Sequence, residues 1–356
     1  MKIIHCSDLH LDSKIDGLPA EKSRIRRLEV VSAFESLCLY AEQNQVKVIL
    51  IAGDAFDTKK ITIKTRDKLV SLINNNKAID FVFLCGNHDK DAFISSFESV
   101  PSNLKFFTDK WQYFYYDNVC VTGLINEKNN LDLAYNNLSL DAENFNIVVL
   151  HGQIAGYVSE KGGENISLPL LKDKNIDYLA LGHIHTYSSG KLDDRGVYAY
   201  SGCLEGRGFD ELGEKGFVLI DTDKKDFISF VPSSKRIISE CEVGLENCEN
   251  YFDYQKKIVK VLTDSYSSKD IIKLVLVGER KPDFEIYKDE LTLSLSDKFF
   301  YVKIVDKTEL KIDKSFYETD KSVKGEFVRL ITESDLSPEL KKRVLTYGLN
   351  ALKGEI

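Results

Sequence analysis

The sequence predicts a layered protein of mixed α/β class, followed by a smaller α+β part. Early in the chain, segments typical of buried strands alternate with helical segments. From residue 118 to residue 231 the predicted elements are mostly strands. The composition then changes after PSSKR at 232–236, where a second run of helices and strands begins. Strands that alternate with helices are typical of a sheet covered by helices, so we expect a layered α/β domain with further parts behind it.

The first part starts with the strand KIIHCSD, followed by a helix over residues 20–44. The apolar stripe of this helix is predicted at Ile25, Leu28, Val31, Phe34, Leu37, Cys38 and Ala41. The basic residues of RIRR (24–27) are expected on its solvent-facing surface. Strands and one more helix follow, with strands predicted at 46–54, 80–89, 118–124, 146–152, 177–185, 196–202, 216–221 and 227–231, and the helix at about 62–76.

The second part contains a predicted helix at 249–262 and strands at 270–279 and 299–307, enough for a small α+β module. Two amphipathic helices end the chain. One carries a stripe of Val323, Phe327, Leu330 and Ile331, and the other a stripe of Leu340, Val344, Leu345, Leu349 and Leu352. We therefore expect three parts, at 1–235, 236–315 and 316–356.

The composition favours a cytoplasmic protein. Of 356 residues, 43% are hydrophobic and 29% are charged, which is ordinary for a soluble globular chain. No apolar run approaches the roughly 18 to 20 residues that span a bilayer, and the amino terminus turns polar too early for a signal peptide. The 7 cysteines are scattered without a CxxC pair, which indicates reduced thiols. A net charge of −8 argues against nucleic acid held mainly by a broad basic surface.

Residue types that bind metals follow one predicted strand after another. They form five clusters: Asp8 and His10 in SDLH, Asp54 and Asp57 in GDAFD, Asn87, His88 and Asp89 in GNHD, His151 in LHG, and His183 and His185 in GHIH. Loops that leave strands of an α/β sheet converge at one edge, where ligand sites form. A single histidine is more often structural, but five of the 6 histidines lie in these clusters, which favours a metal site. His5 has the opposite strand parity and is expected to be structural or to support a ligand.

The donor set narrows the metal. Carboxylate, amide and imidazole groups without thiolate suit a hard to borderline divalent ion, with Mn²⁺ a natural choice. The candidate ligands are too many for one ion that keeps a position open for substrate. Two ions that share a carboxylate, about 3.5–4 Å apart as in two-metal hydrolases, fit better.

The motifs D-x-H, GD-x-x-D, GNHD, HG and GHIH, in this order over about residues 1–220, resemble the calcineurin-like metallophosphoesterase superfamily. The opening HCSDLHLDS and the later YSGCLEGRGFDELGEKGF (200–217) are similar to SbcD-type DNA-repair nucleases. The resemblance implies an α/β/β/α sandwich with a small cap domain and C-terminal helices. It also implies hydrolysis of DNA with two divalent ions, a homodimer, and a coiled-coil ATPase of SbcC type that docks on the last helices.

The resemblance further implies roles for the clustered residues. One ion would be held by Asp8, His10 and His185, the other by Asn87, His151 and His183, with Asp54 bridging them. His88 would donate a proton or stabilise the transition state. Asp89 would orient His88 or cap its loop, two roles that stay open. Some family members carry a histidine linked to exonuclease action where this chain has Asp57, and we expect Asp57 to hydrogen-bond a ligand histidine.

Basic residues near the clusters are candidate contacts to a DNA backbone, namely Lys59, Lys60, Lys64, Arg66 and Arg207. A solvated surface explains the run at 59–68 equally well. Two rival functions also stay open at this point. One is a phosphodiesterase of the same chemistry that acts on nucleotides or cyclic nucleotides, and the other is a scaffold subunit without activity. The last two helices could likewise pack only on their own domain.

Overall fold

The structure is a computed structural model that describes residues 1–56, 62–84, 100–125, 131–155, 165–280, 284–311 and 317–352. The chain forms two compact units, Met1–Ile238 and Ser239–Ile356. Each unit has its own hydrophobic core, so each is described by itself.

The first unit is built on two six-stranded sheets. The order in the first sheet is β14 (Ile228–Pro232), β13 (Gly216–Asp221), β1 (Lys2–Cys6), β2 (Val48–Ala52), β3 (Asp80–Leu84) and β4 (Leu104–Phe106). The order in the second is β11 (Ser188–Lys191), β12 (Val197–Tyr200), β10 (Tyr178–Gly182), β7 (Phe145–His151), β6 (Val119–Gly123) and β5 (Gln112–Tyr116). In each sheet four neighbouring strands are parallel. Antiparallel pairing occurs at the β13–β14 side of the first sheet and at both edges of the second.

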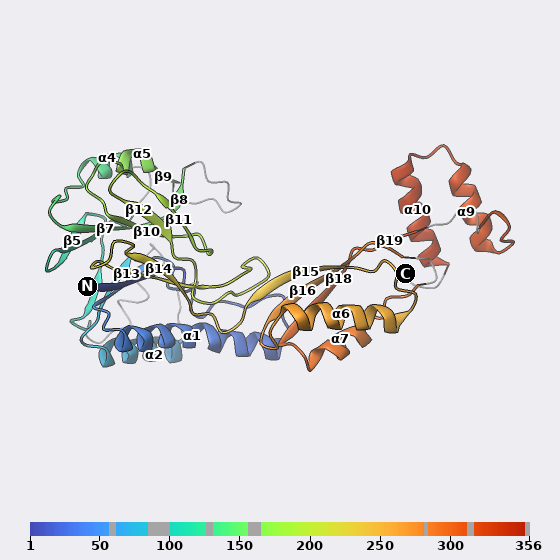
Figure 1. The fold of residues 1–356 in the computed structure, drawn as a ribbon, viewed down its shortest axis with the longest axis horizontal. Helices are drawn as coiled ribbons and strands as arrows, with labels where there is room; N and C mark the ends of the chain where they lie inside the picture. Colours follow the sequence, from blue (N-terminus) through green and yellow to red (C-terminus); the bar gives the residue numbers. More distant parts are fainter. Residues whose placement is uncertain are drawn as a thin grey trace. The chain divides into compact units, whose positions relative to one another are not determined.

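The sheets pack face to face and helices cover their outer faces (Figure 1). Strand β2 illustrates the layers, because Ile49 and Ile51 pack toward the helices while Val48 and Leu50 pack toward the other sheet. Helices α1 (Ala20–Gln43) and α2 (Ile63–Asn75) lie on the first sheet, and α4 (Leu131–Asn136) and α5 (Leu168–Leu171) on the second. The α/β/β/α sandwich implied by the resemblance is therefore confirmed.

Helix α1 departs from its predicted orientation. Leu28, expected in the apolar stripe, is 54% exposed, whereas Arg26 is 0% exposed. The prediction that RIRR forms a solvent-facing surface is wrong for Arg26. Its guanidinium pairs with Glu29 at 2.6 Å and with Glu205 at 2.8 Å, so the buried face of the first turns is set by ion pairs instead of apolar periodicity.

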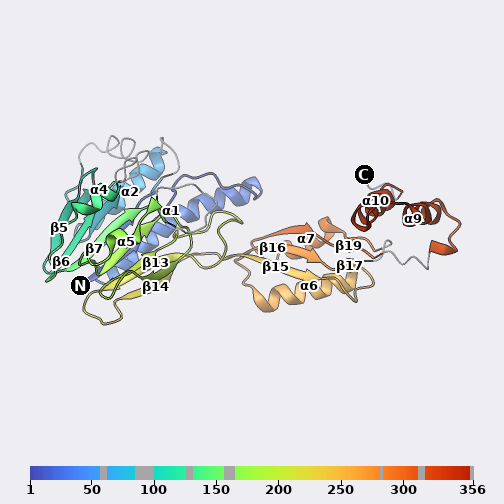
Figure 2. The same ribbon diagram turned by 90° about the horizontal axis from the view of Figure 1, so that it is seen from above.

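The second unit holds a three-stranded sheet with the order β15 (Ile238–Gly244), β16 (Ile271–Val277) and β18 (Tyr301–Asp306). Helices α6 (Tyr251–Ser265) and α7 (Lys288–Ser296) run alongside the strands of this sheet (Figure 2). Their apolar residues form one core with those of β16. Helices α9 (Val323–Glu333) and α10 (Pro338–Ala351) pack on each other through a small cluster that includes Val328, Leu345 and Leu349.

Most predicted elements are confirmed within a few residues, but several strands were missed. The missed strands are β4, β5, β11 and β15, together with the two-residue pairs β8 (Gln153–Ile154) with β9 (Asn165–Ile166) and β17 (Glu279–Arg280) with β19 (Glu309–Leu310). Strands at sheet edges are half exposed, so they lack a continuous apolar run. Across the described ranges no helix is long and apolar enough to cross a membrane. The cysteines in those ranges are all free thiols.

Candidate metal centre

The candidate ligands lie at the carboxyl ends of the central strands of both sheets. Asp8 and His10 follow β1 and Asp54 follows β2, which is its parallel neighbour. His151 ends β7, and His183 follows β10, the parallel neighbour of β7. The place where parallel strands end is where α/β folds form their binding sites. The fold thus brings together residues that are up to 177 positions apart in the chain, Asp8 and His185.

A first cluster consists of Asp8, His10 and His185, each with a donor atom within 4.8 Å of the others. The Nε2 atoms of His10 and His185 are 3.1 Å apart, and Nε2 of His185 is 3.6 Å from Oδ1 of Asp8. Three potential metal-binding atoms therefore converge on one small volume. Imidazole nitrogen and carboxylate oxygen are a donor set that suits a divalent ion.

A second cluster consists of Asp8, Asp54 and His151, again within 4.8 Å. Oδ2 of Asp54 is 3.5 Å from Nε2 of His151 and 4.0 Å from Nε2 of His10. One oxygen of Asp54 thus lies between a residue of the first cluster and one of the second. Asp8 belongs to both clusters, so two carboxylates are placed where adjacent ions could share them.

The surroundings of Asp8 keep its carboxyl group ionised. Burial alone would raise the pKa of Asp8, but the electrostatic influence of the neighbouring His151, His185 and His10, with the hydrogen bond from Ser7, keeps it below the usual range. Both carboxylate oxygens also accept hydrogen bonds from the backbone N–H of His183, at 3.1 and 3.0 Å. Asp8 is therefore an ionised carboxylate, the form that binds a cation.

His183 offers a further donor. Its Nε2 atom is buried and has no hydrogen-bond partner within the part of the chain that the structure describes. Its ring lies against that of His151, with centroids 5.5 Å apart. Burial, followed by the nearby His151, lowers the pKa of His183, so its imidazole is neutral. A buried ring nitrogen without a partner is costly, and binding to a metal ion would satisfy it.

The backbone at the site is held in an unusual conformation. Asp8, His10, Asp54 and His183 have positive φ angles of 50°, 44°, 47° and 102°. Such angles are uncommon for residues other than glycine and cluster at functional sites. Hydrogen bonds between the two loops, from the N–H of Asp8 to Gly53 O and from that of His10 to Asp54 O, hold this conformation.

Two glycines make room for His151. A Cβ on Gly53 would lie 2.1 Å from Nδ1 of His151, and a Cβ on Gly182 would lie 1.8 Å from the carbonyl oxygen of Ala52. Nδ1 of His151 donates to that same carbonyl at 2.8 Å, which leaves Nε2 unprotonated and directed at Asp54. Both glycines therefore have a packing role beside His151.

His185 is oriented by a residue that sequence reasoning did not single out. Its Nδ1 lies 2.7 Å from Oε1 of Glu211, a buried carboxylate. Burial raises the pKa of Glu211, but hydrogen bonds from His185 and Arg207 lower it more, so this carboxyl is ionised. The only sequence signal was the motif GRGFDELGEKG, which contributed to the resemblance without suggesting a role for Glu211.

Of the other predicted site residues, the structure describes Lys64, Arg66 and Arg207. Asp57, Lys59, Lys60, Asn87, His88 and Asp89 lie outside the described residues. Lys64 is exposed in the first turn of α2, and Arg66 pairs with Asp67 at 2.7 Å. The guanidinium of Arg207 bonds to Glu211 at 2.6 Å.

Comparison with known proteins defines the class. The model of the calcineurin-like phosphoesterase family matches residues 1–187, more than half of the chain, and the chain belongs to this family. The protein is thus a metallophosphoesterase, and the resemblance inferred from its motifs is confirmed.

Curated relatives include proteins of DNA repair. The chain is 25% identical over 340 residues to the DNA double-strand break repair protein Mre11 of Saccharolobus solfataricus, covering 89% of this chain and 85% of that protein. It is 28% identical over 249 residues to the uncharacterized metallophosphoesterase YhaO of Bacillus subtilis, covering 64% of this chain and 58% of that protein. A stretch of 91 residues is 31% identical to Mre11 of Methanosarcina acetivorans, covering 25% of this chain and 14% of that protein.

Proposed function

We propose that this protein is a nuclease that hydrolyses phosphodiester bonds at DNA ends with two Mn²⁺ ions, in the cytoplasm and as part of a DNA-repair complex. The observation that carries the proposal is the convergence of Asp8, His10 and His185 beside Asp54 and His151. It occurs in a chain that aligns over 89% of its length with a double-strand break repair protein.

Within this proposal two sets of residues would each hold one ion. Asp8, His10 and His185 hold the first, and His151, His183 and Asn87 hold the second, with Asp54 shared between them. The ions, when bound, supply the Lewis-acid charge that binds and polarises a phosphodiester. Mn²⁺ is proposed because the donors are oxygen and imidazole nitrogen without thiolate.

The remaining steps belong to the chain's own residues. His88 delivers a proton to the leaving oxygen, and Asp89 orients the ring of His88. Asp57 hydrogen-bonds a ligand histidine. Lys64 contacts the DNA backbone beside the site, together with Lys59 and Lys60.

The test is a comparison of substrates with the purified full chain. In Mn²⁺ we expect cleavage of end-labelled linear and hairpin DNA, and loss of cleavage in His88→Asn without loss of bound metal. Hydrolysis of bis(p-nitrophenyl) phosphate or cyclic nucleotides with DNA untouched would establish the small-molecule alternative. A protein that binds no metal and hydrolyses none of these substrates would be the scaffold.

We further propose that α9 and α10 dock on the coiled coil of an SbcC-type ATPase and that the nuclease is a homodimer. On these helices Leu340 and Tyr347 are 41% and 71% exposed. They line a groove of about 510 Å³ together with Phe327 and Val344. Apolar grooves of this kind suit an amphipathic helix.

Size-exclusion chromatography with the candidate ATPase tests the docking. Tyr347→Asp should abolish co-elution, whereas Glu339→Gln, a change at an exposed residue in the first turn of the same helix, should preserve it. Undiminished co-elution of Tyr347→Asp would contradict the docking site. Light scattering of the protein alone tests the dimer.

A further inference from the structure

The segment from Cys203 to Lys215 surrounds His185. Nζ of Lys215, which is buried, donates to the carbonyl oxygen of His185 at 2.9 Å. The backbone N–H of Cys203 donates to the same oxygen at 3.5 Å. Glu211 meets the imidazole itself, with Oε1 2.7 Å from Nδ1. The main chain and the ring of one candidate ligand are thus held by a single stretch of sequence.

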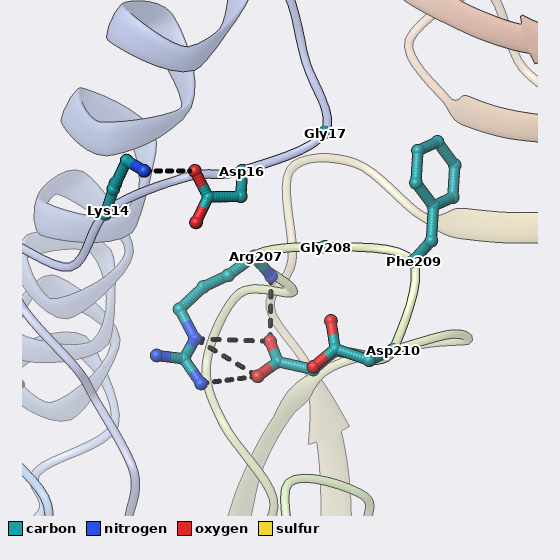
Figure 3. Close-up of a pocket in the computed structure, with 8 residues that line it drawn as sticks. Lys14, Asp16, Gly17, Arg207, Gly208, Phe209 and Asp210 are labelled. Atoms are coloured by element: carbon teal, nitrogen blue, oxygen red, sulfur yellow. Dashed lines mark hydrogen bonds and ion pairs between the residues drawn. The ribbon is translucent and has the colours of Figure 1, made fainter.

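Glu211 is in turn held by Arg207. Nη2 of Arg207 donates to Oε1 at 2.6 Å, and the backbone N–H of Arg207 donates to Oε2 at 2.8 Å. Figure 3 shows the guanidinium of Arg207 turned back toward its own loop, beside a cavity of about 400 Å³ that Lys14 and Phe209 also line. Both oxygens of Glu211 are therefore engaged, and the carboxylate has a defined orientation.

We propose that Glu211 is a positioning residue for metal binding and that Arg207 acts through it. A carboxylate can only accept, so Nδ1 of His185 must carry the proton of the neutral ring. Nε2 then has a free lone pair that can bind a metal ion, and it is directed at Asp8 and His10. A charged acceptor behind a ligand histidine also makes the ligand nitrogen more basic.

Arg207 favours the opposite tautomer of His185, and this makes the role of Glu211 testable. Nη2 of Arg207 lies 3.4 Å from Nδ1 of His185. A guanidinium is only a donor. Without Glu211 it would favour an unprotonated Nδ1 and a protonated Nε2, and that tautomer cannot bind a metal through Nε2. Glu211 therefore protects the metal-binding tautomer of His185 from its cationic neighbour.

The inference rests on the metal centre of the proposed function, and the experiment separates the two. Mn²⁺ affinity of the full chain is measured by titration calorimetry for the wild type, Glu211→Gln, Glu211→Ala and the double variant Arg207→Met/Glu211→Ala. Asp210→Asn is the matched control, since it removes a charge from the exposed neighbouring residue. The tautomer of His185 is observed in the metal-free protein by long-range ¹H–¹⁵N spectra.

Glu211→Ala should weaken Mn²⁺ binding about 10- to 100-fold, the usual effect of losing such a partner. The same variant should show His185 protonated on Nε2. Glu211→Gln, which keeps an acceptor oxygen, should lose less affinity. The double variant should recover part of the affinity lost in Glu211→Ala, and Asp210→Asn should match the wild type.

Wild-type affinity and an unchanged tautomer in both Glu211→Ala and Glu211→Gln would overturn the inference. So would a lower melting temperature of the metal-free variants without any change in affinity, because that result means a structural role only. If Glu211→Ala does not fold, the isosteric Glu211→Gln decides alone. A wild type that binds no Mn²⁺ would instead refute the proposed function.

Discussion

Two buried charge clusters in the first unit have similar chemistry and different neighbours. In one, Arg207 and Glu211 form an ion pair, and Glu211 also bonds to the ring of His185. In the other, Arg26 of α1 bonds to Glu29 and Glu205, and Glu29 accepts hydrogen bonds from Nε and Nη2 of Arg236. Both clusters hold charges out of water, yet only the first touches a candidate ligand.

The second cluster joins distant segments of the chain. Arg26 and Glu205 are 179 positions apart, and Arg236 and Glu29 are 207 positions apart. The cluster therefore ties α1 to the loop that contains Glu205 and to the last residues of the first unit. The comparison teaches that a buried ion pair is not itself a sign of function. What distinguishes the Glu211 cluster is that its carboxylate meets a histidine whose other nitrogen faces further ligand atoms.

The largest expected effect comes from breaking the structural cluster. Arg26→Met leaves the carboxylate of Glu205 buried without its charge partner, so we expect a loss of about 3–5 kcal/mol in the free energy of unfolding. Urea unfolding of the metal-free protein measures this loss. Mn²⁺ affinity of the folded fraction should stay at the wild-type value, the reverse of the result for Glu211→Gln. Arg27→Met, at an exposed position in the same turn, should change stability by less than about 0.5 kcal/mol.

The second-largest loss of stability should come from Gly182→Ala. The added methyl group meets the carbonyl oxygen of Ala52, which orients His151. We expect a loss of stability of about 1–3 kcal/mol from overpacking, together with weaker Mn²⁺ binding. Gly208→Ala is the control, because its methyl group meets only the side-chain oxygen of Asp210. Equal behaviour of the two variants would show that His151, unlike His185, needs no precise support.

His5 is a third buried ionisable group, and it lies outside both of these charge clusters. Its burial predicts that the stability of the protein depends on pH. His5 is fully buried, its Nδ1 is hydrogen-bonded to the hydroxyl of Tyr178 at 2.8 Å, and burial lowers its pKa from 6.5 to about 3. Between these values the unfolded chain binds a proton that the folded protein does not. The stability of the metal-free protein should therefore fall as the pH drops from about 6.5 toward 3, with His5 contributing at most about 1.4 kcal/mol per pH unit.

His5→Asn provides the measurement for this prediction. Asparagine keeps a polar atom near Nδ1 but does not titrate in this range. Unfolding free energies at a series of pH values should give a shallower slope for the variant than for the wild type. A parallel pair of slopes would mean that His5 is protonated in the folded protein.

The parts of this picture that follow from local patterns could be predicted from sequence. Apolar runs located the central strands, and polar residues after these runs located Asp8, His10 and His151 at one edge. What could not be predicted depends on contacts far along the chain. Arg26 is buried because of Glu205, which no periodicity within α1 reveals. Glu211 acts on a histidine 26 positions away, and only the folded loop brings the two together.

The central claim is that two ions bind through different histidines, one through His10 and His185 and the other through His151 and His183. Elemental analysis of the purified full chain, equilibrated with Mn²⁺ and desalted, tests it with three variants. The wild type and His5→Asn should each retain two ions per chain, whereas His10→Asn and His183→Asn should each retain about one. Wild-type metal content in both His10→Asn and His183→Asn would contradict the account, and so would a wild-type protein without bound metal.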